Sequence, residues 1–209
     1  MRERIPVRRS VRKGRLAAFL ARRYLERPRI RGHEQVASAR FPRLRSSATG
    51  TRSPGPPLTL SSYLTEERIK VPLDSLDKPA ILREMCCFLA SAADVPDRAA
   101  DIHRVVVERE EVLSTGVGDG LALPHGKCRG LETLEIVAGT TRKPIDFDSM
   151  DGGPVRLVVL MVGPPSAAGS QVKALGHLSR TLRDTELLDR LVNAEDAGRF
   201  HELIVAAGA

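Results

Sequence analysis

The sequence has few aromatic residues and few cysteines. It contains no tryptophan, two tyrosines and five phenylalanines among 209 residues, too few for the base-stacking platform of a protein that binds single-stranded nucleic acid. Its three cysteines, Cys86, Cys87 and Cys128, include no C-x-x-C motif and no framework of pairs. This argues against a disulfide-stabilised secreted domain, and a reduced, cytoplasmic protein is expected.

Long apolar runs are missing as well. The longest, VRLVVLMV at residues 155–162, has the length of a β-strand, whereas a membrane-spanning helix needs ~18 apolar residues or more. No hydrophobic region of a signal peptide is visible near the N-terminus. We therefore expect no membrane span.

Positive charge is concentrated at one end of the chain. The net charge is +7, but residues 1–56 contain 15 arginines and one lysine against three glutamates, a balance of +13 that leaves −6 for residues 57–209. An Arg-rich segment ending in Ser, Thr, Pro and Gly is typical of disorder, so residues 1–57 are predicted to be a disordered basic extension. The alternatives are an arm that binds nucleic acid or a membrane surface, an organellar transit peptide, or sequence upstream of a later translation start.

Residues 58–207 have the pattern of an α/β domain. The predicted strands are 69–73, 133–140 and 155–162, and the predicted helices begin after Asp77, run over 97–111, begin near Gly169 and Asp184, and run over 195–207. The run at 155–162 is apolar at nearly every position, which is typical of a central strand covered on both faces. The helix from Gly169 is expected to bury Val172, Leu175, Leu178 and Leu182. We predict a three-layer domain, in which a mixed β-sheet is flanked by helices on both faces.

The most unusual stretch is STGVGDGLALPHGK, residues 114–127. Glycine permits positive φ and close backbone approach, so the amides of a glycine-rich loop can converge on an anion. A short strand at 121–123 is ended by Pro124, which should leave His125 at a rim and outside a strand ladder. The hypothesis is a loop that holds a phosphate carried by His125. The loop residues concerned are Ser114, Thr115, Gly116, Gly118 and Gly120.

Three common kinds of phosphate or metal site do not fit this stretch. The loop lacks the Gly-Lys-Ser/Thr ending of a P-loop. Its glycines precede a strand, whereas a dinucleotide fingerprint places them between a strand and a helix. The histidines show no H-x-x-x-H or Cys/His spacing, so neither a metal nor another cofactor is predicted.

One arginine lies on a helix face that should be buried. The predicted helix at 97–111 has an apolar line through Ile102, Val106 and, by continuation, Leu113, and Arg109 falls on the same line. Because a guanidinium cannot shed its charge, Arg109 needs an acceptor. That acceptor is either a neighbouring glutamate, at 108, 110 or 111, or an anion bound by the glycine loop that follows.

Histidine is well suited to carry a phosphoryl group for a short time. Neutral imidazole is nucleophilic at cytoplasmic pH and is also a good leaving group. Phosphoryl transfer asks the protein mainly for positioning and for neutralisation of charge on the equatorial oxygens. A loop of N–H donors and one arginine would supply both.

The run REEVLSTGVGDGLALPHGK, residues 109–127, closely resembles the active-site signature of a known family. This is the fructose–mannitol type of IIA component in the bacterial phosphoenolpyruvate-dependent phosphotransferase system, which includes the nitrogen-related regulatory IIA proteins. The similarity also covers LSSYLTEERI, KPAILREMCCFLA, RLVVLMVGPP and VKALGHLSRTLRD. It implies a type-2 EIIA domain over residues 58–207 and does not touch residues 1–56.

The resemblance implies a phosphotransferase that works through a phosphohistidine. The phosphocarrier protein HPr would donate a phosphoryl group to His125, and Arg109 matches the active-site arginine of the family, which favours a bound phosphate over a glutamate partner. The loop from Ser114 to Gly120 matches the loop around that histidine, and Lys127 continues the signature. The group would then pass to a IIB component for sugar uptake. Alternatively, the domain is a regulatory IIA module whose phosphorylation state controls binding to kinases, transporters or transcription regulators.

The sequence departs from the family pattern at one position. The family commonly has a second histidine at the start of the helix after the central strand, where this chain has Gln171. A glutamine can still donate a hydrogen bond to a phosphate oxygen or orient His125, but it cannot become charged. His177 is not expected to replace the missing histidine, because it lies on the flank of the buried helix face.

Overall fold

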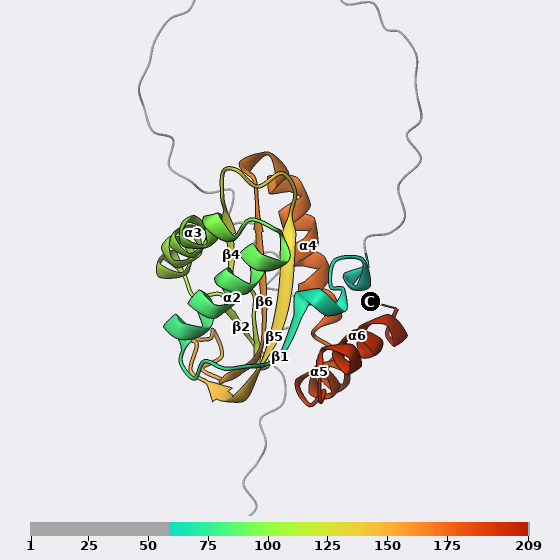
Figure 1. Cartoon of the computed structure of the whole chain (residues 1–209). Helices are drawn as coiled ribbons and strands as arrows, with labels where there is room; N and C mark the ends of the chain where they lie inside the picture. The colour runs from blue at the N-terminus through green and yellow to red at the C-terminus, as the bar shows by residue number, and fades with distance from the viewer. Residues whose placement is uncertain (1–58, 209) are drawn as a thin grey trace, which may run out of the picture. The chain divides into compact units, whose positions relative to one another are not determined.

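The computed structural model describes residues 59–208, which form a domain of strands and helices (Figure 1). The strands are β1 (Ile69–Leu73), β2 (Gly116–Gly118), β3 (Leu121–Ala122), β4 (His125–Lys127), β5 (Glu135–Ile145) and β6 (Val155–Gly163). The α-helices are α2 (Lys78–Ala92), α3 (Ala99–Val112), α4 (Ala168–Thr181), α5 (Thr185–Val192) and α6 (Ala197–Ala206). The basic extension predicted at residues 1–57 lies outside the described residues.

The strands form one mixed sheet with β6 at its centre. The order is β1-β5-β6-β3-β2, and β4 also pairs with β6. Strand β6 is antiparallel to β5 and parallel to both β3 and β4. At the edges, β1 joins β5 in parallel and β2 forms an antiparallel hairpin with β3. The prediction of a central strand at 155–162 is confirmed, since Arg156 is the one residue of β6 that is not buried.

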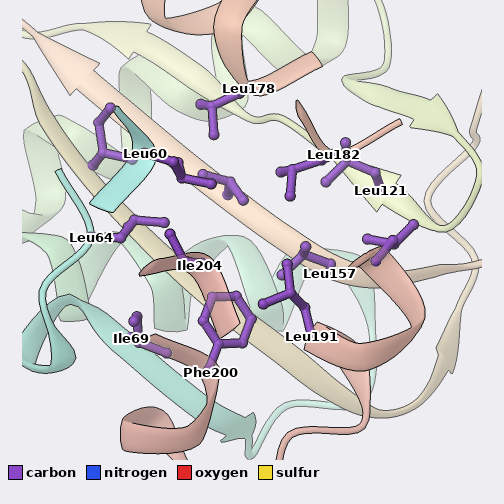
Figure 2. Close-up of a cluster of buried hydrophobic side chains, with 14 of the residues drawn as sticks. Leu60, Leu64, Ile69, Leu121, Leu157, Leu178, Leu182, Leu191, Phe200 and Ile204 are labelled. Carbon is purple, nitrogen blue, oxygen red and sulfur yellow. The ribbon is translucent and has the colours of Figure 1, made fainter. Parts of the chain in front are cut away.

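Helices cover both faces of this sheet, and each face has its own hydrophobic core. Helices α2 and α3 pack on one face, and α4, α5 and α6 pack on the other (Figure 1). Figure 2 shows the second core, where Leu178 of α4, Leu191 of α5 and Phe200 of α6 meet Leu157 of β6. The side chains of β6 alternate between the cores, as a strand requires. Val158, Leu160 and Val162 join one core, and Leu157, Val159 and Met161 join the other. The predicted three-layer α/β architecture is confirmed.

Asp77 caps α2 as predicted. Its side chain accepts a hydrogen bond from the backbone N–H of Ala80 at 2.8 Å. Pro79, in the first turn, has no N–H that would need a partner. The start of α2 is therefore set by local sequence.

Two element predictions were wrong in detail. The strand predicted to end at residue 140 continues to Ile145, because its end pairs with Val155 of β6. On α4, Val172 is 49% exposed, whereas the buried residues are Gln171, Ala174 and Leu178. The buried face is displaced because the polar Gln171 finds a hydrogen-bond partner inside the domain.

Candidate functional site

The backbone of His125 is held by the centre of the sheet. His125 is the first residue of β4 and pairs with Met161 of β6, so the prediction that it lies outside a ladder was wrong. Pro124 has no N–H, but its carbonyl accepts from the Met161 amide at 3.0 Å, and pairing resumes at once. Gly126 lets β4 lie close to α3, since a Cβ there would come within 3.0 Å of a valine methyl of that helix. His125 therefore sits beside the last turn of α3, which carries Arg109.

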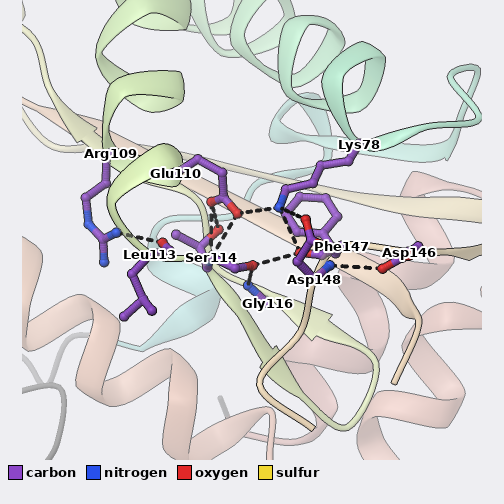
Figure 3. Close-up of polar contacts among 10 residues, drawn as sticks. Lys78, Arg109, Glu110, Leu113, Ser114, Gly116, Asp146, Phe147 and Asp148 are labelled. Atoms are coloured by element: carbon purple, nitrogen blue, oxygen red, sulfur yellow. Dashed lines mark hydrogen bonds and ion pairs between the residues drawn. The ribbon is translucent and has the colours of Figure 1, made fainter. Parts of the chain in front are cut away.

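Both ring nitrogens of His125 have a partner. The Nε–H of Arg109 donates to Nε2 of His125 at 3.2 Å, and Nδ1 of the ring lies 2.9 Å from the carbonyl oxygen of Leu123. A guanidinium can only donate, so Nε2 carries the lone pair and Nδ1 carries the proton that it donates to Leu123. Nη1 of Arg109 donates to the Leu113 carbonyl at 2.9 Å (Figure 3). The guanidinium is thus oriented between the end of α3 and the imidazole.

The surroundings of His125 keep its ring neutral. Burial lowers the pKa of His125 from 6.5 to about 4 because it disfavours the charged ring, although the hydrogen bond to Leu123 opposes this shift. The positive charges of Arg109 and Lys127 lower the pKa further, and the carboxylate of Glu110 partly offsets them. The ring is therefore in its nucleophilic form at neutral pH.

The three glycines of the predicted phosphate loop shape a tight hairpin. Gly118 and Gly120 have φ of +96° and +81°, which side chains with a Cβ rarely adopt. A Cβ on Gly116 would lie 2.5 Å from Oγ of Ser149. Glycine is thus required for the turn of the hairpin and for its close approach to the segment before β6.

Ser114 and Thr115 are bonded to groups of the protein. The hydroxyl of Ser114 donates to the carbonyl of Phe147 at 2.7 Å and accepts from the amide of Gly116 at 3.2 Å. The amide and the hydroxyl of Thr115 both donate to the carboxylate of Glu110. The structure therefore brings Arg109 and His125 together. Ser114 ties the start of the loop to Phe147 (Figure 3), and Thr115 ties it to Glu110.

Two charged residues beside the site were not predicted as site residues. Glu110 is 8% exposed, and its carboxylate lies 2.9 Å from Nζ of Lys78. The same Nζ lies 2.9 Å from the Phe147 carbonyl and from Asp148. From the sequence, Glu110 is expected at most to pair with Arg109, and no spacing links it to Lys78, which lies on another helix.

Gln171 contacts the backbone next to the histidine. It is 5% exposed, and its Nε2 donates to the Gly126 carbonyl at 2.9 Å. Lys127 is exposed at the end of β4. His177 lines a separate cavity of about 210 Å³ with Tyr63 and other residues, and its Nε2 is buried without a hydrogen-bond partner.

Residues 59–208 contain no group of three or more His, Cys, Asp and Glu side chains placed to hold a metal ion. Within that same range, no helix is long and apolar enough to cross a membrane.

Comparison with known proteins identifies relatives of two kinds. Residues 62–207 match the family described as phosphoenolpyruvate-dependent sugar phosphotransferase system, EIIA 2. The chain is 33% identical over 147 residues to the nitrogen regulatory protein of Bradyrhizobium diazoefficiens, covering 70% of this chain and 95% of that protein. It is 30% identical over 147 residues to the fructose-specific EIIABC component of Bacillus subtilis, covering 70% of this chain but only 23% of that much longer protein.

A solved structure is also similar to this chain. The nitrogen regulatory protein IIA-Ntr from Neisseria meningitidis matches with a TM-score of 0.63 and 25% identity, over 69% of this chain and 97% of that chain. Sequence and fold therefore point to the same group of proteins.

Proposed function

We propose that this chain, which belongs to the EIIA 2 family of the phosphoenolpyruvate-dependent sugar phosphotransferase system, carries a phosphoryl group on Nε2 of His125. The supporting observation is one contact: the lone pair of a neutral imidazole faces the guanidinium of Arg109 at 3.2 Å. A nucleophile and a fixed positive charge are thus adjacent. These are the two parts that phosphoryl transfer requires.

The proposed step exchanges one P–N bond for another. Nε2 of His125 attacks the phosphorus of a phosphohistidine on the donor, a P–N bond forms on His125, and the electron pair of the donor's P–N bond returns to the donor's ring. The proton on Nδ1 remains in place because it donates to Leu123 at 2.9 Å. The phosphorylated ring is then cationic and a good leaving group for the next transfer.

Arg109 supplies the charge that this step needs. Its contact with Nε2 ends when the lone pair forms the new bond, so its Nε–H turns to an oxygen of the phosphoryl group. The Leu113 carbonyl, 2.9 Å from Nη1, continues to hold one side of the guanidinium. The remaining N–H groups then neutralise the phosphoryl oxygens by charge-assisted hydrogen bonds.

The other predicted site residues support this pair. In the proposal, the loop formed by Ser114, Thr115, Gly116, Gly118 and Gly120 shapes the wall of the site. Gln171 fixes the backbone next to His125 through the Gly126 carbonyl, and Lys127 adds positive charge. The donor is the phosphocarrier protein HPr, and the acceptor is a IIB component.

A second candidate function is regulation without onward transfer to a sugar. The observation that favours it is the match to the nitrogen regulatory protein of Bradyrhizobium diazoefficiens, which extends over 95% of that protein. In this case, the charge of the phosphoryl group on His125 alters binding to a kinase, a transporter or a transcription regulator.

Transfer of labelled phosphate tests the proposed function. The full chain is incubated with labelled phosphoenolpyruvate, enzyme I and HPr, and we expect one acid-labile phosphoryl group that disappears in His125→Ala. His201→Gln is the control, because His201 lies on α6, which packs on the face of the sheet opposite α3. Absence of label from the wild type, or label that persists in His125→Ala, contradicts the proposal. Addition of a IIB component then separates the candidates, since only a transport carrier loses its label to it.

A further inference from the structure

Glu110, which directly follows Arg109 in the chain, has a buried carboxylate whose hydrogen bonds go to residues other than His125. Both oxygens of Glu110 accept from the Thr115 amide, at 3.0 and 3.1 Å, and one also accepts from the Thr115 hydroxyl at 2.5 Å. Lys78 completes the set with an ion pair at 2.9 Å. Removing a carboxylate from water is costly, and such a group is tolerated when it is paired and fully hydrogen-bonded.

Four segments of the chain meet around this carboxylate. Glu110 lies in the last turn of α3, Lys78 begins α2, and Phe147, which contacts Lys78, lies in the segment before β6 (Figure 3). Thr115 directly precedes β2. Lys78 Nζ lies 2.9 Å from the Phe147 carbonyl and 5.0 Å from the centre of its ring. Ser114 donates to the same carbonyl at 2.7 Å. Ser114 and Thr115, at the start of the loop, are thus held on one side by the segment before β6 and on the other side by α3.

The held segment carries the anchor of the guanidinium. Leu113 directly precedes Ser114 and Thr115, and its carbonyl accepts from Nη1 of Arg109 at 2.9 Å. Because Ser114 and Thr115 are fixed, the Leu113 carbonyl is fixed as well. The remaining freedom of the Arg109 side chain is then a short swing between His125 and a phosphoryl group.

We propose that Glu110 is a positioning residue, which holds the Leu113 carbonyl through Thr115 and so aims the Arg109 guanidinium at Nε2 of His125. This inference rests on the proposed phosphoryl transfer for its importance, although the geometry can be tested separately. Lys78 supports the same arrangement. Its positive charge compensates the Glu110 carboxylate, which would otherwise repel the incoming phosphoryl oxygens.

Glu84 offers a matched control, because its carboxylate is partly buried and is bonded to two backbone amides and a lysine. Glu84 on α2 accepts from the amides of Asp74 and Ser75 at 3.0 and 2.9 Å and pairs with Lys70 at 2.7 Å. Its contacts resemble those of Glu110, but they join α2 to β1, at the edge of the sheet opposite β2. Truncating Glu84 therefore removes a partly buried carboxylate with the same kinds of partners, without touching the site.

The experiment compares Glu110→Ala, Glu110→Gln and Glu84→Ala in the full chain. Hydrogen exchange of the Arg109 Nε–H is measured by NMR, and the rate of phosphoryl transfer from phosphorylated HPr is measured with kcat and KM separated. In Glu110→Ala we expect exchange to quicken by on the order of tenfold or more and kcat to fall by about 10²-fold, with a smaller change in KM. Glu110→Gln keeps an acceptor for the Thr115 amide, so its Arg109 exchange rate and its kcat are both expected to stay near those of the wild type.

The proposal is overturned if folded Glu110→Ala matches Glu84→Ala in both Arg109 exchange and kcat. If Glu110→Ala does not fold, Glu110→Asp keeps the charge but shortens the side chain and so draws the carboxylate away from the Thr115 amide. Unchanged Arg109 exchange in folded Glu110→Asp contradicts the proposal as well. A wild type that accepts no phosphoryl group contradicts the proposed function, while the exchange measurement still decides whether Glu110 positions Arg109.

Discussion

The ionisation of His125 gives a quantitative test of the site. A histidine whose pKa is lowered on folding binds its proton more weakly in the folded than in the unfolded chain. Its contribution to stability is therefore complete above the unfolded pKa, near 6.5, and is lost as pH falls toward the folded value of about 4. At 1.36 kcal/mol for each pKa unit, the complete effect is about 3 kcal/mol.

The perturbation is His125→Gln, which removes this proton-binding group and leaves the other titrating groups in place. Between pH 7.5 and pH 4.5, the wild type is expected to lose about 2.5 kcal/mol more unfolding free energy than the variant. The assay is urea unfolding of both proteins across this range, together with NMR titration of the His125 ring. The same titration shows whether phosphoryl acceptance by the neutral ring can remain constant from pH 5 to pH 8.

Two results refute this reasoning. One is a ring pKa between 6 and 7, the range of an exposed histidine. The other is a pair of stability curves that stay parallel from pH 7.5 to pH 4.5. In either case, burial and Arg109 would not hold the ring neutral, and the proposed nucleophile would be partly protonated between pH 6 and pH 7.

Four further predictions concern single contacts. Arg109→Lys cannot span the Leu113 carbonyl and the phosphoryl oxygens with one rigid fork, so transfer from phosphorylated HPr should slow by about 10²-fold with stability nearly unchanged by thermal melting. Gln171→Ala leaves the Gly126 carbonyl without its donor and should lower the urea-unfolding free energy by about 1–3 kcal/mol. Asp77→Ala removes the α2 cap and should cost about 1 kcal/mol in the same assay. Gly139→Ala would place a Cβ 2.8 Å from Leu73 Cδ2 and should lower the melting temperature, at a cost of about 1–3 kcal/mol.

The predictions of fold succeeded where local patterns determine structure. The apolar run of β6 and the cap of α2 each carry their own signal, because burial on two faces needs an unbroken apolar sequence and a helix start needs an acceptor for its amides. The predicted end of β5 was too early, because Ile145 pairs with Val155, a contact that no local pattern encodes. The prediction that Val172 is buried was wrong, because apolar periodicity cannot show that the glutamine one position earlier is the buried residue.

The features of the site also divide into those that local sequence predicts and those that arise only in the folded chain. The phase predicted for α3 placed Arg109 on the buried line, but Glu110 is the buried residue there and Arg109 is half-buried. Arg109 does have acceptors, but they are the Leu113 carbonyl and Nε2 of His125, and neither is a neighbouring glutamate. The depressed pKa of His125 could not be predicted, because it results from burial that only the folded chain creates. The ion pair of Glu110 and Lys78 was also beyond prediction, since α2 and α3 must pack before these side chains meet.

The strand pairing of His125 has a consequence for encounters with other proteins. A functional histidine on a loose loop would become ordered only when a partner arrives, and that loss of conformational entropy would weaken the complex. Here the backbone at His125 is paired to Met161 in the central strand before any encounter. In the proposed transfer, the partner therefore need not supply the free energy that would order this backbone, so a small contact area and a short-lived complex are sufficient.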